Sequence, residues 1–418
     1  MKINSNSIQK LIAIHVFLVV VFLFLWSVIG LPWGIVYIFD LLVCVEFAWG
    51  LRNLQCTLRR AKAMHFLAWL IIYGFFLILT QLFNFVSPLA AIMAFRRTFR
   101  FYLFFFACVV LLTEKNINSI MNMLCAIQIV NFLLTIYQYA VLKLNQDNLG
   151  GIFGIEKGAN AYSNVYLCLL CTYMLIRYLT KKTKILPMVL TIGSALVIAV
   201  LAELKIFFIE ILVIVLMGIL LSNPSARTVK TIVFIAIGLV VAIALFGSLF
   251  PEHLAILLSW VLLTQYTTES IAGYRINRMN AFSEINKIFF KDNPLRNLFG
   301  YGFGNCEEGT AFYAQYSHYK YSWFTHQVSF LDTGFVGILF IASFFVLVYI
   351  FSAKSKKVNP ENSAYYTLGQ IMSVLCMIWI VYDASLRSEV AFMAFFALAI
   401  PLAIRNEWQL CQGRESAL

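Results

Sequence analysis

The chain consists of continuous apolar runs separated by short polar segments. A helix that crosses a bilayer needs roughly 20 predominantly apolar residues, and about twelve runs approach this length. The runs do not alternate between apolar and polar positions, which predicts helices and argues against a membrane β-barrel. The expected spans are residues 11–29, 32–51, 64–85, 97–113, 117–141, 161–180, 185–202, 206–222, 229–250, 327–352, 364–382 and 388–404.

One polar segment is much longer than the others and divides the chain. Residues 1–250 contain the first nine expected spans, residues 251–326 form the long segment, and residues 327–418 contain three more spans and a polar tail. We therefore expect an all-α membrane protein with one long extracytoplasmic loop between helices 9 and 10.

The long segment has apolar residues at helical spacing from about residue 273 to residue 289. This periodicity predicts an amphipathic helix, with Arg275 and Arg278 on one face near its start. A helix start offers unpaired N–H donors and partial positive charge, which suit a phosphate group.

The composition agrees with a membrane environment. Hydrophobic residues make up 62% of the chain and charged residues only 12%, whereas soluble domains carry about 25% charged residues. The net charge is +12, and the positions of the cations explain much of it. With an inner N-terminus, every short inner segment contains Lys or Arg, as the positive-inside rule predicts. We therefore place both termini in the cytoplasm and expect no nucleic-acid partner.

Several cations oppose this rule because they fall in outer segments. A single such side chain also fits snorkelling to lipid phosphates, but their gathering on one side favours a common anionic ligand. The group comprises Arg96, Arg97, Arg100, Lys205, Arg275, Arg278 and Arg387.

Two stretches resemble the O-antigen ligase and O-antigen polymerase superfamily. In the first, THQVSFLDTGFVGILF, a His followed by a polar residue opens a span and glycines follow; these are His326, Gln327, Gly334 and Gly337. Phe340 stands where the ligase form carries Gly, Thr or Tyr.

The second stretch, GYRINRMNAFSEINKIFFKDNPLRNLFGYGFG, resembles the preceding part of the family pattern through Arg275, a proline and a Gly-x-Gly turn. Lys205 stands where the family usually has Arg, which keeps the charge but loses the bidentate fork. Asp383 and Arg387 resemble an Asp and Arg pair of the ligases.

The resemblance implies transfer of a glycan from undecaprenyl pyrophosphate to a sugar hydroxyl, on the outer side of a bacterial cytoplasmic membrane. His326 would act as base and Arg275 as a catalytic cation. The sequence contains no D-x-D or H-E-x-x-H pattern, so we expect no metal or other cofactor. Membrane lipids and other polysaccharide-assembly proteins complete the expected partners. The expected substrate-binding residues are Lys205, Arg278, Arg97, Arg100, Arg387, Asp383 and Gln327.

Three functions stay open at this point. A polymerase of capsular, O-antigen or exopolysaccharide repeat units is the first, with inversion at the anomeric centre. A ligase that transfers the glycan to a terminal acceptor is the second. A transporter or flippase of lipid-linked sugars is the third, and it predicts internal repeats and charges near the bilayer midplane. Asp40, Glu46 and Glu210 lie inside apolar runs without partners evident from the sequence.

Overall fold

A computed structural model describes residues 5–222, 225–268, 276–306, 315–316 and 324–415. Within these ranges the chain forms helices and connecting turns, with no β-strand. The long helices are α1 (Ser5–Ser27), α2 (Tyr37–Arg60), α3 (Met64–Phe83), α4 (Pro88–Leu111), α5 (Glu114–Ala140), α6 (Ala159–Leu179), α7 (Ile185–Leu201), α8 (Lys205–Leu220), α9 (Ala226–Leu249), α14 (Thr325–Val358), α15 (Ser363–Tyr382) and α16 (Ala391–Glu415).

Nine helices in the described ranges are long and apolar enough to cross a membrane: α1, α2, α3, α5, α6, α9, α14, α15 and α16. Among the other expected spans, α7 and α8 are shorter, with 17 and 16 residues. α4 carries three arginines in its interior. The protein is therefore an all-helical, multi-pass membrane protein, and the count of twelve spans stays a prediction.

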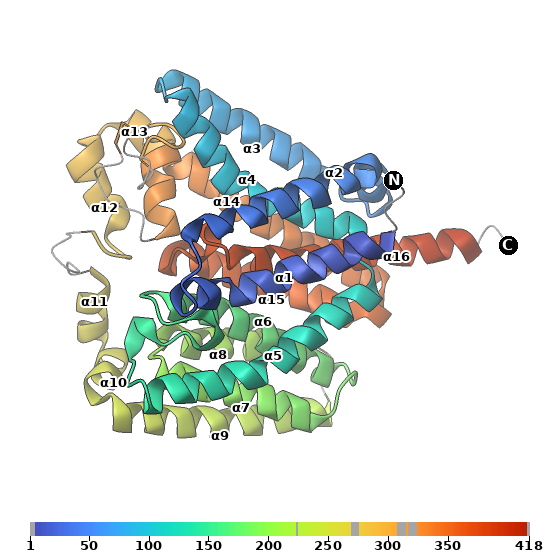
Figure 1. The fold of residues 1–418 in the computed structure, drawn as a ribbon, viewed down its shortest axis with the longest axis vertical. Helices are drawn as coiled ribbons and strands as arrows, with labels where there is room; N and C mark the ends of the chain where they lie inside the picture. Colours follow the sequence, from blue (N-terminus) through green and yellow to red (C-terminus); the bar gives the residue numbers. More distant parts are fainter. Residues whose placement is uncertain (1–4, 223–224, 269–275, 307–314, 317–323, 416–418) are drawn as a thin grey trace.

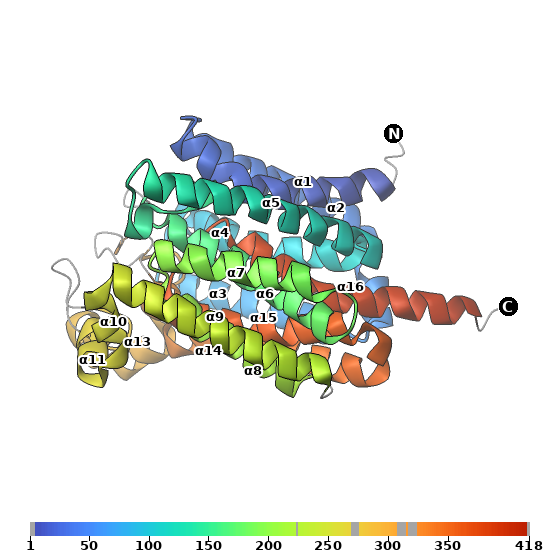
Figure 2. The same ribbon diagram turned by 90° about the horizontal axis from the view of Figure 1, so that it is seen from below.

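The short helices and the chain ends lie at opposite ends of the bundle. Between α9 and α14 the chain forms α10 (Pro251–Leu258), α11 (Trp260–Thr268), α12 (Ala281–Ile285) and α13 (Pro294–Phe299). Figure 1 places these four at one end, whereas the start of α1 and the end of α16 lie at the other in both ribbon views (Figures 1 and 2). The start of α1 and the end of α16 thus share one side, and α10 to α13 occupy the opposite side.

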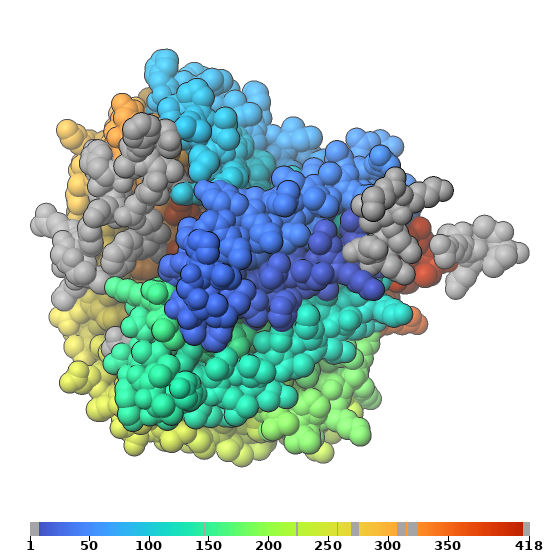
Figure 3. Space-filling model, in the orientation of Figure 1, coloured from blue at the N-terminus to red at the C-terminus, as the bar shows by residue number. Residues whose placement is uncertain are grey.

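The helices differ in how much lipid they face. The apolar parts of α6, α15 and α16 are 78%, 78% and 89% buried, whereas that of α9 is only 17% buried. A small residue permits the close approach of α15 to α16. A Cβ on Gly369 of α15 would lie 2.2 Å from Pro401 Cγ of α16. In Figure 3, α1, α2 and α5 cover one side of this centre.

The helix predicted from about residue 273 to residue 289 begins later in the structure. Residues 269–275, including Arg275, lie outside the described residues. Residues 276–280 form a turn, and α12 begins only at Ala281 and continues as a π-helical turn, Asn286–Phe290. The side chain of Asn280 accepts the Asn277 N–H at 2.6 Å, and such a local bond competes with helical hydrogen bonding. Arg278 therefore precedes α12 and does not lie on its first turn.

The glycines of the two family-like stretches meet at a break in α14. Gly334 has φ +63°, so α14 is interrupted there. The break leaves the carbonyls of Leu331 and Asp332 free to accept the N–H groups of Tyr301 at 2.7 Å and Gly302 at 2.8 Å. A Cβ on Gly334 would lie 2.3 Å from the Leu298 carbonyl carbon. These glycines therefore let the segment after α13 dock onto the first turns of α14.

Candidate functional site

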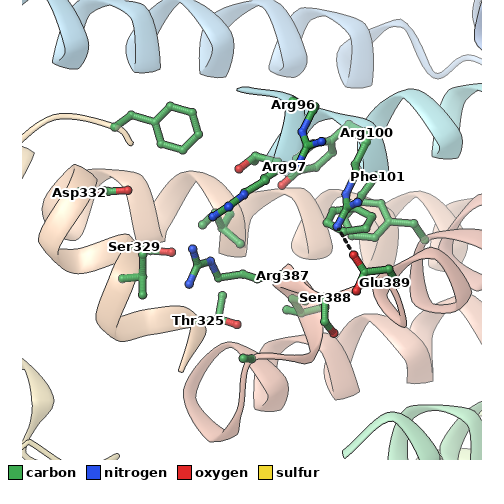
Figure 4. A pocket seen from close by; sticks show the side chains of 18 of the residues that line it. Arg96, Arg97, Arg100, Phe101, Thr325, Ser329, Asp332, Arg387, Ser388 and Glu389 are labelled. Carbon is green, nitrogen blue, oxygen red and sulfur yellow. Dashed lines mark hydrogen bonds and ion pairs between the residues drawn. The ribbon is translucent and has the colours of Figure 1, made fainter. Parts of the chain in front are cut away.

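A pocket with several arginines lies at the end of the bundle that carries the long segment. Its cavity measures about 350 Å³ and lies between α4, the first turns of α14 and the connection from α15 to α16. Four arginines and two carboxylates are among its lining residues: Arg96, Arg97, Arg100, Arg387, Asp332 and Glu389. Figure 4 shows this group from close by.

Three of the arginines come from the interior of α4. The sequence predicted a span from residue 97, with the arginines at its start, but α4 begins at Pro88. At 1.5 Å per residue, Arg100 therefore lies about 18 Å along the helix from its first residue. The helix therefore begins before the predicted span and continues through the arginines.

Two of these arginines form ion pairs that hold other helices. Arg96 Nη1 lies 3.1 Å from Asp40 Oδ2 of α2. Arg100 is buried, with one Nη 3.0 Å from Glu389 Oε1 and the other 3.6 Å from Asp40 Oδ1. Buried charges need such pairing to offset the loss of hydration. Arg96 and Arg100 thus join α2, α4 and the start of α16.

The other two arginines converge on a common space. Figure 4 shows Arg97, from α4, and Arg387, from the turn before α16, extending toward the same part of the pocket. Ser329 and Asp332 of α14 lie on the facing wall (Figure 4). Both guanidinium groups bring positive charge and N–H donors to one cavity. A phosphate or carboxylate is the ligand that such a pair accepts bidentately.

The carboxylate on the facing wall is fixed by the docked segment. Asp332 is 3% exposed. Its Oδ2 accepts the Gly304 N–H at 3.1 Å, and its Oδ1 accepts the Cys306 N–H at 2.9 Å. The glycine turn after α13 therefore orients one acidic wall of the pocket.

His326 lies behind this pocket and does not line it. The side chain is fully buried. Nε2 lies 3.0 Å from the Arg278 carbonyl oxygen, and Nδ1 lies 3.3 Å from the Ile380 carbonyl oxygen. A neutral imidazole donates through only one nitrogen. In one of these two contacts, therefore, the unprotonated ring nitrogen faces a carbonyl oxygen, and both atoms are acceptors. Gln327 also contacts the turn of residues 276–280, since its Nε2 donates to the Asn277 carbonyl at 3.3 Å.

Arg278 is held between two aromatic rings. Its guanidinium carbon lies 4.5 Å from the centroid of Phe324 and 4.6 Å from that of Tyr382. Its Nε donates to the Tyr382 carbonyl at 2.9 Å. The cation–π contacts stabilise the arginine beside His326, so this part of the site is closely packed.

Asp383 lies between the arginine pocket and the cluster formed by Arg278, His326 and Gln327. Its backbone carbonyl accepts the Thr325 N–H at 2.9 Å, and Thr325 lines the pocket. Its Oδ1 accepts the Ser385 N–H at 2.8 Å. Burial raises the pKa of the Asp383 carboxyl to about 6, against smaller opposing effects of Ser385 and Arg278. This carboxyl therefore keeps its proton to a higher pH than an exposed aspartate does.

Lys205 belongs to a third group, at the turn between α7 and α8. Its Nζ lies 5.2 Å from the centroid of Tyr266 in α11. Nearby, Glu203 Oε2 lies 3.0 Å from His253 Nε2. Burial raises the pKa of Glu203, and burial, together with Lys205, lowers that of His253. Lys205 does not line the arginine pocket.

The structure thus brings Arg97, Arg100 and Arg387 into one pocket and gathers Arg278, His326, Gln327 and Asp383 beside it. Sequence reasoning did not include Glu389, Ser329 or Thr325 in the site. It noted Asp40 as a charge without an evident partner, and the three interior arginines of α4 were the available signal. A carboxylate in an apolar span often pairs with a cation from another helix.

No protein-family model and no curated protein matches this sequence. The fold and hydropathy define the class as a multi-pass helical membrane protein.

Proposed function

We propose that this protein is a membrane glycosyltransferase that moves a glycan from undecaprenyl pyrophosphate to a sugar hydroxyl, as a polymerase of polysaccharide repeat units. The proposal rests on the convergence of Arg97 and Arg387 in a pocket at the end of the bundle that carries the long segment (Figure 4). The resemblance of the stretch around His326 to the O-antigen ligase and polymerase superfamily gives the reaction. In this proposal the pocket faces outward from a bacterial cytoplasmic membrane and both termini are cytoplasmic.

The chemistry requires a cationic site at the level of the lipid headgroups. As the bond between the anomeric carbon and the pyrophosphate oxygen breaks, negative charge grows on the departing diphosphate. Arg97 and Arg387 would stabilise this charge more in the transition state than in the bound donor, which accelerates the transfer. The attacking hydroxyl forms the new bond from the opposite face and loses its proton, so the anomeric centre is inverted.

A base must take that proton, and His326 keeps this role as a prediction. In the described arrangement, neither ring nitrogen points to open space, because both contact backbone carbonyls. Base catalysis through Nε2 therefore requires residues 276–278 to move away when substrate binds, as catalytic contacts often rearrange on complex formation.

The transporter alternative is less consistent with the break in α14. Discontinuous helices of transporters use unwound carbonyls to coordinate ions. Here the carbonyls of Leu331 and Asp332 accept N–H groups from Tyr301 and Gly302. The break thus serves to dock the segment after α13.

The test is a reaction in proteoliposomes that contain the purified protein and a lipid diphosphate-linked oligosaccharide. A ladder of products that each differ by one repeat unit supports the polymerase. A single transfer to a different glycolipid acceptor indicates a ligase. Movement of intact donor between leaflets without a new glycosidic bond indicates a flippase and contradicts the proposal.

A further inference from the structure

A second basic cavity lies at the opposite end of the bundle from the arginine pocket. It measures about 760 Å³ and is bounded by the last turns of α6, α8 and α14 and the first turns of α15. Four lysines and one carboxylate are among its lining residues: Lys181, Lys182, Lys356, Lys357 and Glu361. The lining is therefore cationic overall, although α6, α8 and α14 all end there with partial negative charge.

One lysine is fixed in the wall. Lys356 Nζ donates to Thr367 Oγ1 at 2.9 Å and also to the Leu221 carbonyl. An ammonium group has three N–H donors, so with these two bonds among the described residues a third donor remains for a ligand oxygen. Lys356 thus provides a preorganised positive charge that joins α8, α14 and α15.

A buried acceptor lies deeper in the same cavity. Gln370 lines it and is 2% exposed. Its Oε1 has no hydrogen-bond partner among the described residues. A buried polar atom without a partner costs about 1–3 kcal/mol, which a ligand hydroxyl would remove.

One side of the cavity is open to the lipid-facing surface. Leu220, which lines it, is 72% exposed, and Leu221 and Ala353 add apolar surface beside the lysines. A soluble anion would gain nothing from this apolar edge, whereas an acyl chain attached to the anion would contact it. Basic pockets between membrane helices are suited to anionic lipid headgroups.

We propose that this cavity binds an anionic glycerophospholipid, with its phosphate against Lys356 and Lys357 and a headgroup hydroxyl donating to Gln370 Oε1. Phosphatidylglycerol has this combination of one phosphate and free hydroxyls. The site does not depend on the proposed transferase activity.

The test is native mass spectrometry of the full-length protein, released from micelles that contain phosphatidylglycerol and phosphatidylcholine in equal amounts. We expect one phosphatidylglycerol to stay bound to the wild type. Lys356→Gln with Lys357→Gln should weaken this binding about 30-fold, since each lysine near an anionic headgroup adds about 1 kcal/mol and 1.4 kcal/mol is a factor of ten. Lys354→Gln, an exposed neighbour on α14 that does not line the cavity, is the matched control.

Three results would overturn the site. The first is unchanged binding in the double variant, and the second is an equal loss in Lys354→Gln, which would indicate general surface attraction. The third is displacement of the lipid by inorganic phosphate or glycerol phosphate, which would indicate a site for a soluble anion. Phosphatidylmethanol, a phosphodiester with the same single charge and no headgroup hydroxyl, tests the hydroxyl contact. The wild type should prefer phosphatidylglycerol about fivefold, the value of one ordinary hydrogen bond, and Gln370→Leu should abolish this preference. Equal binding of both lipids by the wild type would refute the contact with Gln370.

Discussion

The pair formed by Arg97 and Arg387 gives the most specific prediction about activity. Each guanidinium extends into the pocket from a different part of the chain (Figure 4). Replacement of either by glutamine removes a charge but keeps a hydrogen-bonding side chain of intermediate length. Because both groups would contact the departing diphosphate, each replacement should raise the transition-state energy more than the energy of the bound donor.

The expected size follows from the contacts that are lost. A hydrogen bond to a charged group contributes about 1.5–3 kcal/mol, which corresponds to a loss of roughly 10- to 150-fold in kcat/KM. The double variant should deviate from the product of the single effects, because both groups bind one ligand. Arg→Lys at either position should recover part of the rate, since it retains the charge without the bidentate geometry.

The assay measures initial rates of glycan transfer in proteoliposomes with a lipid diphosphate-linked donor. Arg59→Gln is the control, because it removes an exposed arginine near the end of α2, opposite the pocket. Melting midpoints of Arg97→Gln and Arg387→Gln, measured beside the rates, separate a loss of stability from a loss of transfer chemistry. Wild-type rates in both glutamine variants would refute the reasoning.

Four further predictions concern the groups around the pocket. Arg100→Met should destabilise the fold by about 3–5 kcal/mol, because it leaves the buried Glu389 carboxylate without its cation, whereas Asp40 keeps Arg96; a thermal melt followed by size exclusion measures this, and an unchanged midpoint would exclude the structural role. Gly334→Ala should destabilise by about 2–5 kcal/mol, from positive φ and the close Leu298 carbonyl, whereas Gly193→Ala, with no atom within 4 Å of the added carbon, should not lower the melting midpoint. His326→Gln keeps a hydrogen-bond donor but cannot act as base, so the transfer rate should fall at least about 100-fold; a retained rate would assign His326 to anchoring Arg278. Asp383→Asn should gain melting temperature relative to the wild type as pH rises from 4 to 7, because the folded carboxyl, with a pKa raised to about 6 from its ordinary 3.8, holds its proton in a window where the unfolded chain has released it; a constant difference across this range would contradict the buried carboxyl.

The helices themselves were predictable from apolar runs, but the start of α4 was not. The sequence predicted a span that begins at residue 97, with the arginines at its start. They are accommodated inside the helix because Asp40 and Glu389, which come from two other parts of the chain, supply the opposing charge. Pairing between distant segments leaves no periodic signal in either segment, so a local pattern could not reveal it.

The candidate site shows the same limit. The pattern around His326 lies at the same end of the bundle as the arginine pocket, but it could not show that both imidazole nitrogens contact backbone carbonyls. Likewise, the sequence showed Gly334 as a motif position. It did not show why glycine is needed there, which is that the Leu298 backbone approaches α14 too closely for a side chain. Both facts depend on where the segment before α14 docks, which is a tertiary contact.

The most direct test is to locate the diphosphate of a bound donor. A cryo-electron microscopy map of the protein in nanodiscs, with a non-transferable lipid diphosphate-linked sugar, would show it. Density for the two phosphates between Arg97 and Arg387 is the predicted result. Density against Lys205 and Arg278, with the arginine pocket unchanged, would contradict the assignment of this pocket to the donor.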